Sequence, residues 1–124
     1  MSKNSSPGFP IFAKYEIAIT YKLEGKEYPI SHHLTAPSAQ DKIDYWRTMA
    51  DRELSEDGSR YISIADTLEA ACQLWDKLAQ SVEGYNFDGA GEKWKELVPS
   101  EHKRAAVDVL LKRAGALQRA QEKN

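Results

Sequence analysis

The chain has 124 residues and a formal net charge of −2 at pH 7, a length that predicts one domain. A hydrophobic share of 41% with 10% aromatic residues is typical of a folded protein and argues against disorder. No run of apolar residues exceeds three, which argues against a membrane-spanning helix. The polar first ten residues contain no secretory signal core, and the single cysteine cannot form an internal disulfide. We therefore expect a cytoplasmic protein without a membrane partner.

The N-terminal part of the chain predicts a β-hairpin. Residues 1–10 are rich in Ser, Pro and Gly and are expected to form a flexible arm. Residues 15–23 and 27–34 each alternate apolar and polar side chains, and a short turn containing Gly25 lies between them. Pro29 has no amide hydrogen, so we expect it at a sheet edge or with that side facing solvent. Because an isolated hairpin is marginally stable, its apolar face should pack on helices.

Helices are predicted for most of the remaining chain. Ser38 is a natural N-cap with Asp41 three residues later. The helix that follows has a predicted apolar stripe of Ile43, Tyr45, Trp46, Met49 and Leu54. The segment Tyr61–Ile64 is either a third short strand or the lead-in to a second helix, which is predicted to continue to Val82 and to end at Gly84. A helical turn over 92–97 and a last helix from Pro99–Ser100 complete the order. The apolar stripe predicted for the second helix is Ile64, Leu68, Ala71, Cys72, Trp75, Leu78, Ala79 and Val82, and the stripe predicted for the last helix is Ala106, Val107, Leu110, Leu111, Ala114 and Leu117.

This order of elements predicts an α+β fold in which an N-terminal antiparallel hairpin packs against about three helices. A third short strand is an open alternative. We expect a flexible arm over residues 1–10, a single domain over residues 11–120 and a frayed tail over residues 121–124.

Three histidines are the strongest candidates for metal binding or catalysis. His32 and His33 are adjacent on the second predicted strand, so their rings should point to opposite faces and cannot easily share one metal ion. His102 is on a different element, and no common zinc-ligand spacing connects the three. Cys72 is in the apolar stripe of its helix and is expected to behave as a small hydrophobic residue. No catalytic residue and no cofactor is predicted.

Charge and aromatic content both bear on the partners. Residues 38–89 carry five basic and eleven acidic side chains, whereas residues 90–124 carry eight basic and five acidic ones. The acidic balance disfavours nucleic acid, which needs a clustered positive surface. We expect His102, Lys103 and Arg104, at the start of the last helix, to find partners within the chain. The aromatic side chains exceed what a small core holds, which favours contact with another protein or self-association. The candidate contact residues are Trp46, Tyr61, Tyr85, Phe87 and Trp94.

One stretch of the chain resembles a known family. Leu74-Trp75-Asp76-Lys77-Leu78 leads to Val82-Glu83-Gly84-Tyr85, and Trp94 precedes the run from Val98 to Val107 with its pattern P-x-x-H-K-x-A-A-V. This layout, over about residues 74–107, resembles small prophage-encoded tail-assembly proteins of the chaperone-like type. The resemblance implies a small helical or α+β protein that assists tail assembly by binding a phage structural protein. The predicted hairpin lies outside the resemblance.

Two functions therefore remain open from the sequence. The first is a non-enzymatic protein-interaction or assembly protein, for which a tail-assembly accessory is one example. The alternative is a small ligand- or metal-binding domain or enzyme, with a pocket near His32 or His33 and a nearby tyrosine, Tyr21 or Tyr28.

Overall fold

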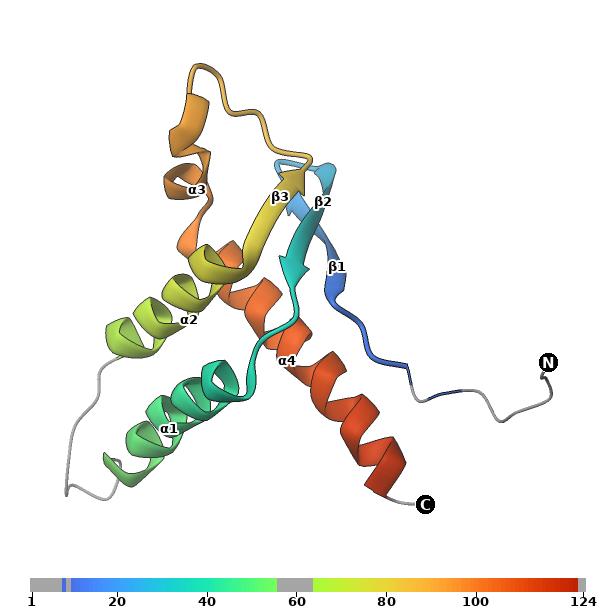
Figure 1. Ribbon diagram of the computed structural model, residues 1–124. Coiled ribbons are helices and arrows are strands. Elements are labelled where there is room, and N and C mark those ends of the chain that lie inside the picture. The colour runs from blue at the N-terminus through green and yellow to red at the C-terminus, as the bar shows by residue number, and fades with distance from the viewer. Residues whose placement is uncertain (1–7, 9, 56–63, 123–124) are drawn as a thin grey trace, which may run out of the picture.

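The computed structural model describes residues 8, 10–55 and 64–122, and for residues 50–55, 64–66 and 115–122 it describes the backbone alone. Within these ranges the fold is α+β, as predicted: a three-stranded antiparallel sheet in the order β1-β2-β3 packs against helices (Figure 1). The strands are β1 (Lys14–Leu23), β2 (Lys26–Thr35) and β3 (Ala79–Glu83). The helices are α1 (Ala39–Ser55), α2 (Ile64–Leu78), the short α3 (Trp94–Leu97) and α4 (Ser100–Glu122). A 3₁₀ turn over Gly91–Lys93 precedes α3.

The hairpin of β1 and β2 confirms the alternating pattern. The two strands pair without interruption from Lys14↔Thr35 to Leu23↔Lys26, and the turn residues Glu24 and Gly25 both have positive φ. Pro29 lies in the half of β2 that β3 does not reach, because the β2–β3 ladder runs only from Ser31 to Leu34. Its missing amide hydrogen therefore leaves no ladder bond broken, as expected.

The predicted end of the second helix is wrong. We expected helix as far as Val82, but α2 ends at Leu78 and residues 79–83 form β3. The reason is a β-bulge: Leu34 pairs with Ala79 and His33 pairs with Ser81, so Gln80 is an extra residue on β3. The bulge gives Ala79 and Val82 a spacing of three on one side of a strand, which in the sequence looks helical. The suggested strand at Tyr61–Ile64 is not placed there: residues 61–63 lie outside the described residues, and Ile64 begins α2.

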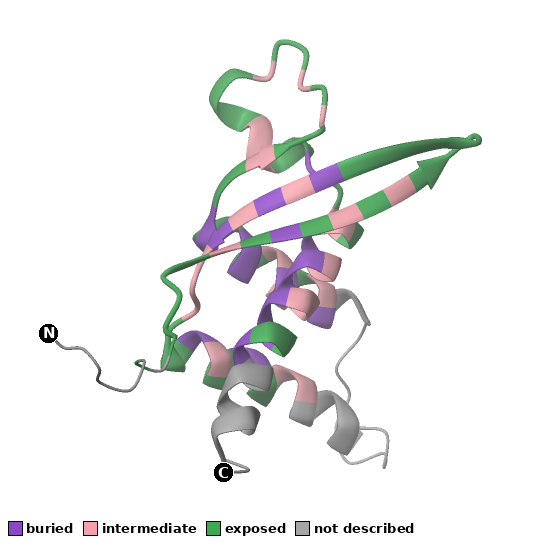
Figure 2. Cartoon of the chain, turned by 90° about the vertical axis from the view of Figure 1, so that its right-hand side faces the viewer, coloured by how far each residue is buried: buried purple, intermediate pink, exposed green. Residues whose placement is uncertain are grey.

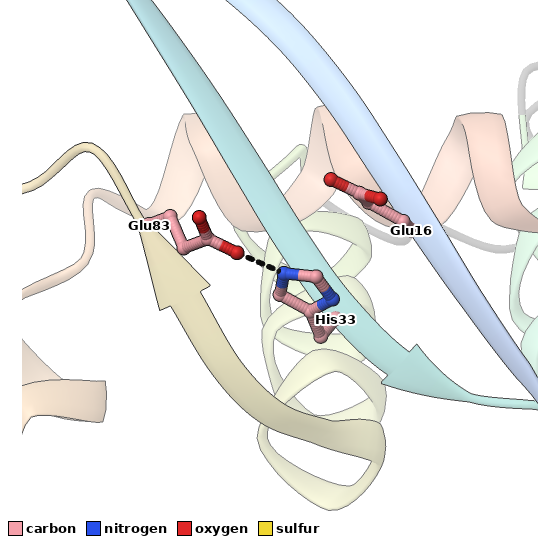
Figure 3. A group of neighbouring side chains, drawn as sticks. All are labelled: Glu16, His33 and Glu83. Carbon is pink, nitrogen blue, oxygen red and sulfur yellow. Dashed lines mark hydrogen bonds and ion pairs between the residues drawn. The ribbon is translucent and has the colours of Figure 1, made fainter.

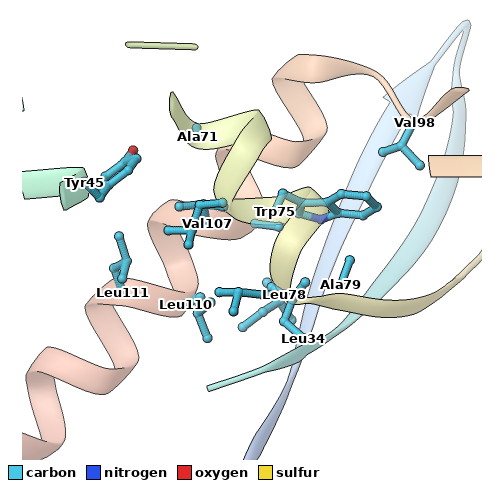
Figure 4. Close-up of a cluster of buried hydrophobic side chains, with 13 residues drawn as sticks. Leu34, Tyr45, Ala71, Trp75, Leu78, Ala79, Val98, Val107, Leu110 and Leu111 are labelled. Atoms are coloured by element: carbon cyan, nitrogen blue, oxygen red, sulfur yellow. The ribbon is translucent and has the colours of Figure 1, made fainter. Parts of the chain in front are cut away.

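The core lies between the sheet and the helices. Trp75 at its centre is fully buried, and Val107 and Leu110 of α4 are buried with it (Figure 4). The buried apolar residues that form one cluster are Ile17, Leu34, Tyr45, Ala71, Leu74, Trp75, Leu78, Ala79, Val98, Ala106, Val107, Leu110 and Leu111. Most of the predicted stripes face the core: Ala71, Trp75 and Leu78 of α2 and the stripe of α4 from Ala106 to Ala114 are buried, whereas Leu68 and Cys72 are only partly buried.

The stripe predicted for α1 needs a correction. Among the α1 side chains that the structure describes, Asp41 and Tyr45 are buried, whereas Ile43 is 46% exposed and Trp46 is 54% exposed. The side chain of Leu54 lies outside the described ones. Ser38 and Asp41 form the predicted capping box: the Ser38 amide donates to Asp41 Oδ2 at 2.9 Å, and the Asp41 amide donates to Ser38 Oγ at 3.1 Å. Lys77 then donates to Asp41 Oδ1 at 2.6 Å, which joins the start of α1 to the end of α2. These bonds allow a carboxylate to occupy the inward side of α1.

The helices cover only part of the hairpin. Figure 2 shows that its distal end, around the turn, projects beyond them with exposed residues on both strands. Leu23, 62% exposed, and Tyr28, 41% exposed, are on this projecting part. No helix in the described part of the chain is long and apolar enough to cross a membrane.

Gly84, directly after β3, packs against β2 more closely than any other residue type permits. Its φ is +102°, and a Cβ atom there would lie 2.4 Å from the Pro29 carbonyl oxygen.

We predict that Gly84→Ala lowers the free energy of unfolding by about 2 kcal/mol or more, because strain at positive φ adds to a clash with backbone. Gly89→Ala is the matched control: φ is +68° and nothing lies within 4 Å, so only the strain of about 1 kcal/mol applies. Urea unfolding measures the free energy of unfolding of both variants. An equal loss in Gly84→Ala and Gly89→Ala would contradict the close packing of Gly84 against β2.

Candidate functional site

His32 and His33 point to opposite faces of the sheet, as the sequence predicted. His32 is fully buried on the side of the helices, whereas His33 lies half-buried on the other face. His102, at the start of α4, is on the helix side with His32. The three imidazoles therefore do not gather around one point.

His32 is held by a buried hydrogen bond. The Trp75 indole Nε1–H donates to His32 Nδ1 at 3.1 Å, and the two rings meet edge to face. Because Nδ1 accepts, the neutral ring carries its proton on Nε2. Burial lowers the pKa of His32 to about 4, and the nearby His102 and His33 contribute to the same direction.

His102 belongs to the same aromatic cluster. Its Nδ1 lies 2.8 Å from the Tyr85 hydroxyl, and the Tyr21 ring stacks on it at 3.8 Å. Burial lowers the pKa of His102 and raises the pKa values of Tyr21 and Tyr85. Neutral histidines and neutral tyrosines at pH 7 suit a packed structural cluster better than proton transfer, which is most efficient with a pKa near the working pH.

The cations at the start of α4 have internal partners, as expected. The Lys103 ammonium is buried, donates to Asp76 Oδ1 at 2.8 Å and lies 5.0 Å from the centre of the Trp75 ring. Burial raises the pKa of the Cys72 thiol, although Lys103 acts in the opposite direction. A thiol in this state is a poor nucleophile, which agrees with the interpretation of Cys72 as a packing residue.

His33 lies beside two carboxylates on the open face of the sheet, in an arrangement that we call the outer-face trio: Glu16, His33 and Glu83 (Figure 3). One residue comes from each strand. Glu16 pairs directly with His33 across β1 and β2, and His33 Nε2 lies 2.6 Å from Glu83 Oε2. One ligand atom from each residue falls within 4.8 Å of the other two. An imidazole and two carboxylates are donors that a divalent transition metal accepts.

Sequence reasoning did not bring this trio together. Glu83 was expected to follow a helix, and β3 was not predicted. A usable signal for Glu16 was present: a two-residue turn at Glu24–Gly25 fixes the hairpin register and places Glu16 opposite His33.

The predicted partner-binding residues differ in their surroundings. Trp46 is exposed on α1, where it contacts Tyr45 edge to face. Tyr85, Phe87 and Trp94 are partly buried and touch one another in a chain of ring contacts. Tyr61 lies outside the described residues.

The surface of the described chain includes a hollow beside β3 and another between α1 and α2. One of about 360 Å³ lies beside β3 and is lined by Phe87 and Trp94 together with Gln80, Ser81, Val82 and Gly91. The other, of about 250 Å³, lies between α1 and α2. The His32 ring itself is in edge-to-face contact with the rings of Trp75 and Tyr85.

Comparisons with protein families, with curated proteins and with solved structures found no match. The function must therefore be inferred from the chain's own surfaces.

We predict that the free energy of unfolding falls as the pH is lowered from 6.5 to 4. Unfolded His32 takes up a proton below its ordinary pKa of 6.5, whereas the folded state resists protonation down to about 4. Stability therefore decreases with falling pH in this window, by up to about 3 kcal/mol, and the contribution is constant above it. Denaturant unfolding at a series of pH values measures the slope.

The comparison variant is His32→Gln, which retains an acceptor for the Trp75 indole. Its unfolding free energy should depend less steeply on pH between 6.5 and 4 than that of the unchanged protein. If the unfolding free energies of the variant and of the unchanged protein depended equally on pH, His32 would not be the group that causes the pH dependence.

Proposed function

We propose that this chain is a non-enzymatic protein-interaction module and that the outward face of α1 is its contact surface. The observation that carries this proposal is the exposure of Ile43 and Trp46, 46% and 54% respectively, on the solvent-facing side of α1. We call these two residues the α1 patch. They are three positions apart, so they lie side by side on one helix face.

The chemistry of the α1 patch fits protein contact. Tryptophan provides a large apolar area with few rotatable bonds, and it is enriched among residues that dominate binding energy. Trp46 already leans on Tyr45, with ring centres 5.7 Å apart, so part of its conformational freedom is lost before a partner binds. This preorganisation reduces the entropic cost of association.

We further propose that the partner is a phage structural protein. The resemblance of residues 74–107 to small prophage tail-assembly proteins supports a phage structural protein as the partner, met in the cytoplasm where tails assemble. The charge around the patch is balanced, with Asp41, Lys42, Asp44 and Arg47 close in sequence, which favours a protein surface over nucleic acid.

We predict that Trp46→Ala weakens partner binding by about 2 kcal/mol, or about thirtyfold in Kd. Its effect on the free energy of unfolding should stay below about 1 kcal/mol, because an exposed ring contributes little to the fold. Affinity capture from a lysate of the source organism, quantified by mass spectrometry and followed by titration of the recovered protein, measures the loss.

The matched control is Leu97→Ala on α3, where the side chain is 57% exposed and outside the α1 patch. This variant should recover the same partner in the same amount as the unchanged protein. Equal recovery by Trp46→Ala and Leu97→Ala would rule out the α1 patch as the contact surface.

A second candidate function, divalent metal binding, is favoured by the outer-face trio. Three donors from three strands make an open half of a coordination sphere, to which water or a ligand could add. It ranks second because the 2.6 Å contact with Glu83 already satisfies His33 and because all three residues are at least partly exposed.

For this second candidate we predict that zinc chloride binds with one ion per chain and that His33→Gln weakens the affinity about tenfold or more, since an imidazole ligand is removed. Isothermal titration calorimetry provides the measurement. Glu69→Gln, which removes an exposed carboxylate on α2, should leave the affinity unchanged. An unaltered isotherm for His33→Gln would eliminate the trio as a metal site.

A further inference from the structure

The outer edge of β1 pairs with no strand in the described part of the chain, and the Arg113 guanidinium is bonded to one of its carbonyls, that of Glu16. β1 pairs with β2 alone and forms one side of the described sheet. Its ten residues contain no proline, and its register with β2 has no bulge. Figure 2 looks onto this edge, and no other element crosses in front of it. A long, regular edge of this kind presents unpaired backbone groups to any strand that can align with it.

The outward-pointing backbone groups are identified by two hydrogen bonds. The Ala36 amide donates to the Ala13 carbonyl at 2.8 Å, so the groups of residue 13 point toward β2. The Arg113 guanidinium of α4 donates at 2.8 Å to the carbonyl of Glu16, which points away from β2. Since direction alternates along a strand, Glu16, Ala18, Thr20 and Lys22 present their N–H and C=O groups outward.

We propose that this edge pairs with the same edge of a second copy, antiparallel, about a two-fold axis through Ile19. In this register Glu16 of one copy is opposite Lys22 of the other, and the two-fold axis repeats this pair of opposite charges on its other side. The sequence of β1 is therefore complementary in charge to itself when reversed.

Neighbouring registers lack this complementarity. Only shifts of two residues keep outward groups facing outward groups. A shift in one direction places Lys14 opposite Lys22, which opposes like charges, and a shift in the other places Ala18 opposite Lys22 and leaves Glu16 beyond the end of the facing strand. The charges thus select both the occupant and the register.

The exposed apolar residues at the two ends of β1 support the same pairing. Phe12, 48% exposed, precedes the strand and contacts Tyr15 edge to face, whereas Leu23, 62% exposed, ends the strand. Antiparallel pairing places Leu23 of one copy opposite Tyr15 of the other and beside Phe12. The apolar side chains that the helices of each copy leave exposed are then buried against the other copy. The two-fold axis repeats this contact at both ends of the paired strands.

Arg113 does not prevent this pairing, because a carbonyl oxygen has two lone pairs and can accept a second hydrogen bond. The β1 edge is also on a different element from the α1 patch. A dimer through β1 leaves Trp46 free, so the outcome for one surface does not decide the other.

Exchanging the charges of Glu16 and Lys22, which face each other across the two-fold axis, tests the proposed dimer. Glu16→Lys and Lys22→Glu each create two like-charge pairs in the dimer and should each raise the dimer Kd about tenfold. The double variant E16K/K22E should restore the Kd to within about threefold of the unchanged protein, and so should an equimolar mixture of the two single variants. Sedimentation velocity over a concentration series, with EDTA present so that no metal is held by Glu16, measures all four.

A cysteine at the axis checks the register. In a Cys72→Ser background, Ile19→Cys should form an interchain disulfide on oxidation, because facing residues of a non-hydrogen-bonded pair have Cα atoms about 4.5 Å apart. Ala18→Cys, whose counterpart lies on a diagonal, is the control and should cross-link far less. Cross-linking of Ala18→Cys and not of Ile19→Cys would overturn the register.

Two results would overturn the pairing itself. One is an unchanged protein that remains monomeric up to about 1 mM, well above the Kd of a specific dimer. The other is a dimer whose Kd is the same in both single variants or is not restored in the double variant. Circular dichroism and urea unfolding would confirm that the variants fold, which is expected because Glu16 and Lys22 are exposed.

Discussion

The hydrogen bond from Trp75 to His32 connects the two halves of the fold. It joins the middle strand of the sheet to α2 inside a region that excludes water, and both side chains are fully buried. The bond requires His32 to be neutral, and burial keeps it so. Lys103 of α4 lies over the other partner, the Trp75 ring, and is neutralised by Asp76. The Trp75 indole thus connects the sheet, α2 and α4.

The fold separates a closed side from an open one. Imidazole and tyrosine groups that could have formed a reaction centre are packed against each other on the closed side, around His32 and Tyr85. In the described part of the chain, the α1 patch, the outer-face trio and the edge of β1 are on accessible surfaces. This arrangement is the basis of the proposal that the chain recognises a partner through its surface, where geometry and charge select the partner.

The sequence predicts the local elements well and the long-range pairing poorly. The period of two in residues 15–34 locates the hairpin, and the stripes of α2 and α4 locate the core. β3 was missed because its bulge at Gln80 gives Ala79 and Val82 a helical spacing, and its partner strand is more than forty residues away. α1 was misjudged because Asp41, held by Ser38 and Lys77, occupies the inward side that apolar Ile43 was expected to fill.

The same distinction applies to the candidate site. The opposite orientation of His32 and His33 follows from strand geometry alone and is confirmed. The contact of His33 with Glu83 depends on β3 and so could not be predicted. Periodicity also does not tell which aromatic residues remain exposed: Trp46 is exposed and Trp75 is buried, although both were expected in apolar stripes.

The sheet order has a consequence for how the chain acquires its structure. β1 and β2 are joined by a two-residue turn, so the hairpin can form within microseconds and before any helix is in place. β3 joins β2 only after α1 and α2 have been built between them, because the contact of His33 with Glu83 spans 50 residues. During synthesis both edges of the hairpin are therefore unpaired at first. β3 later covers the outer edge of β2 over Ser31–Leu34, whereas the outer edge of β1 gains no strand from the described part of the chain.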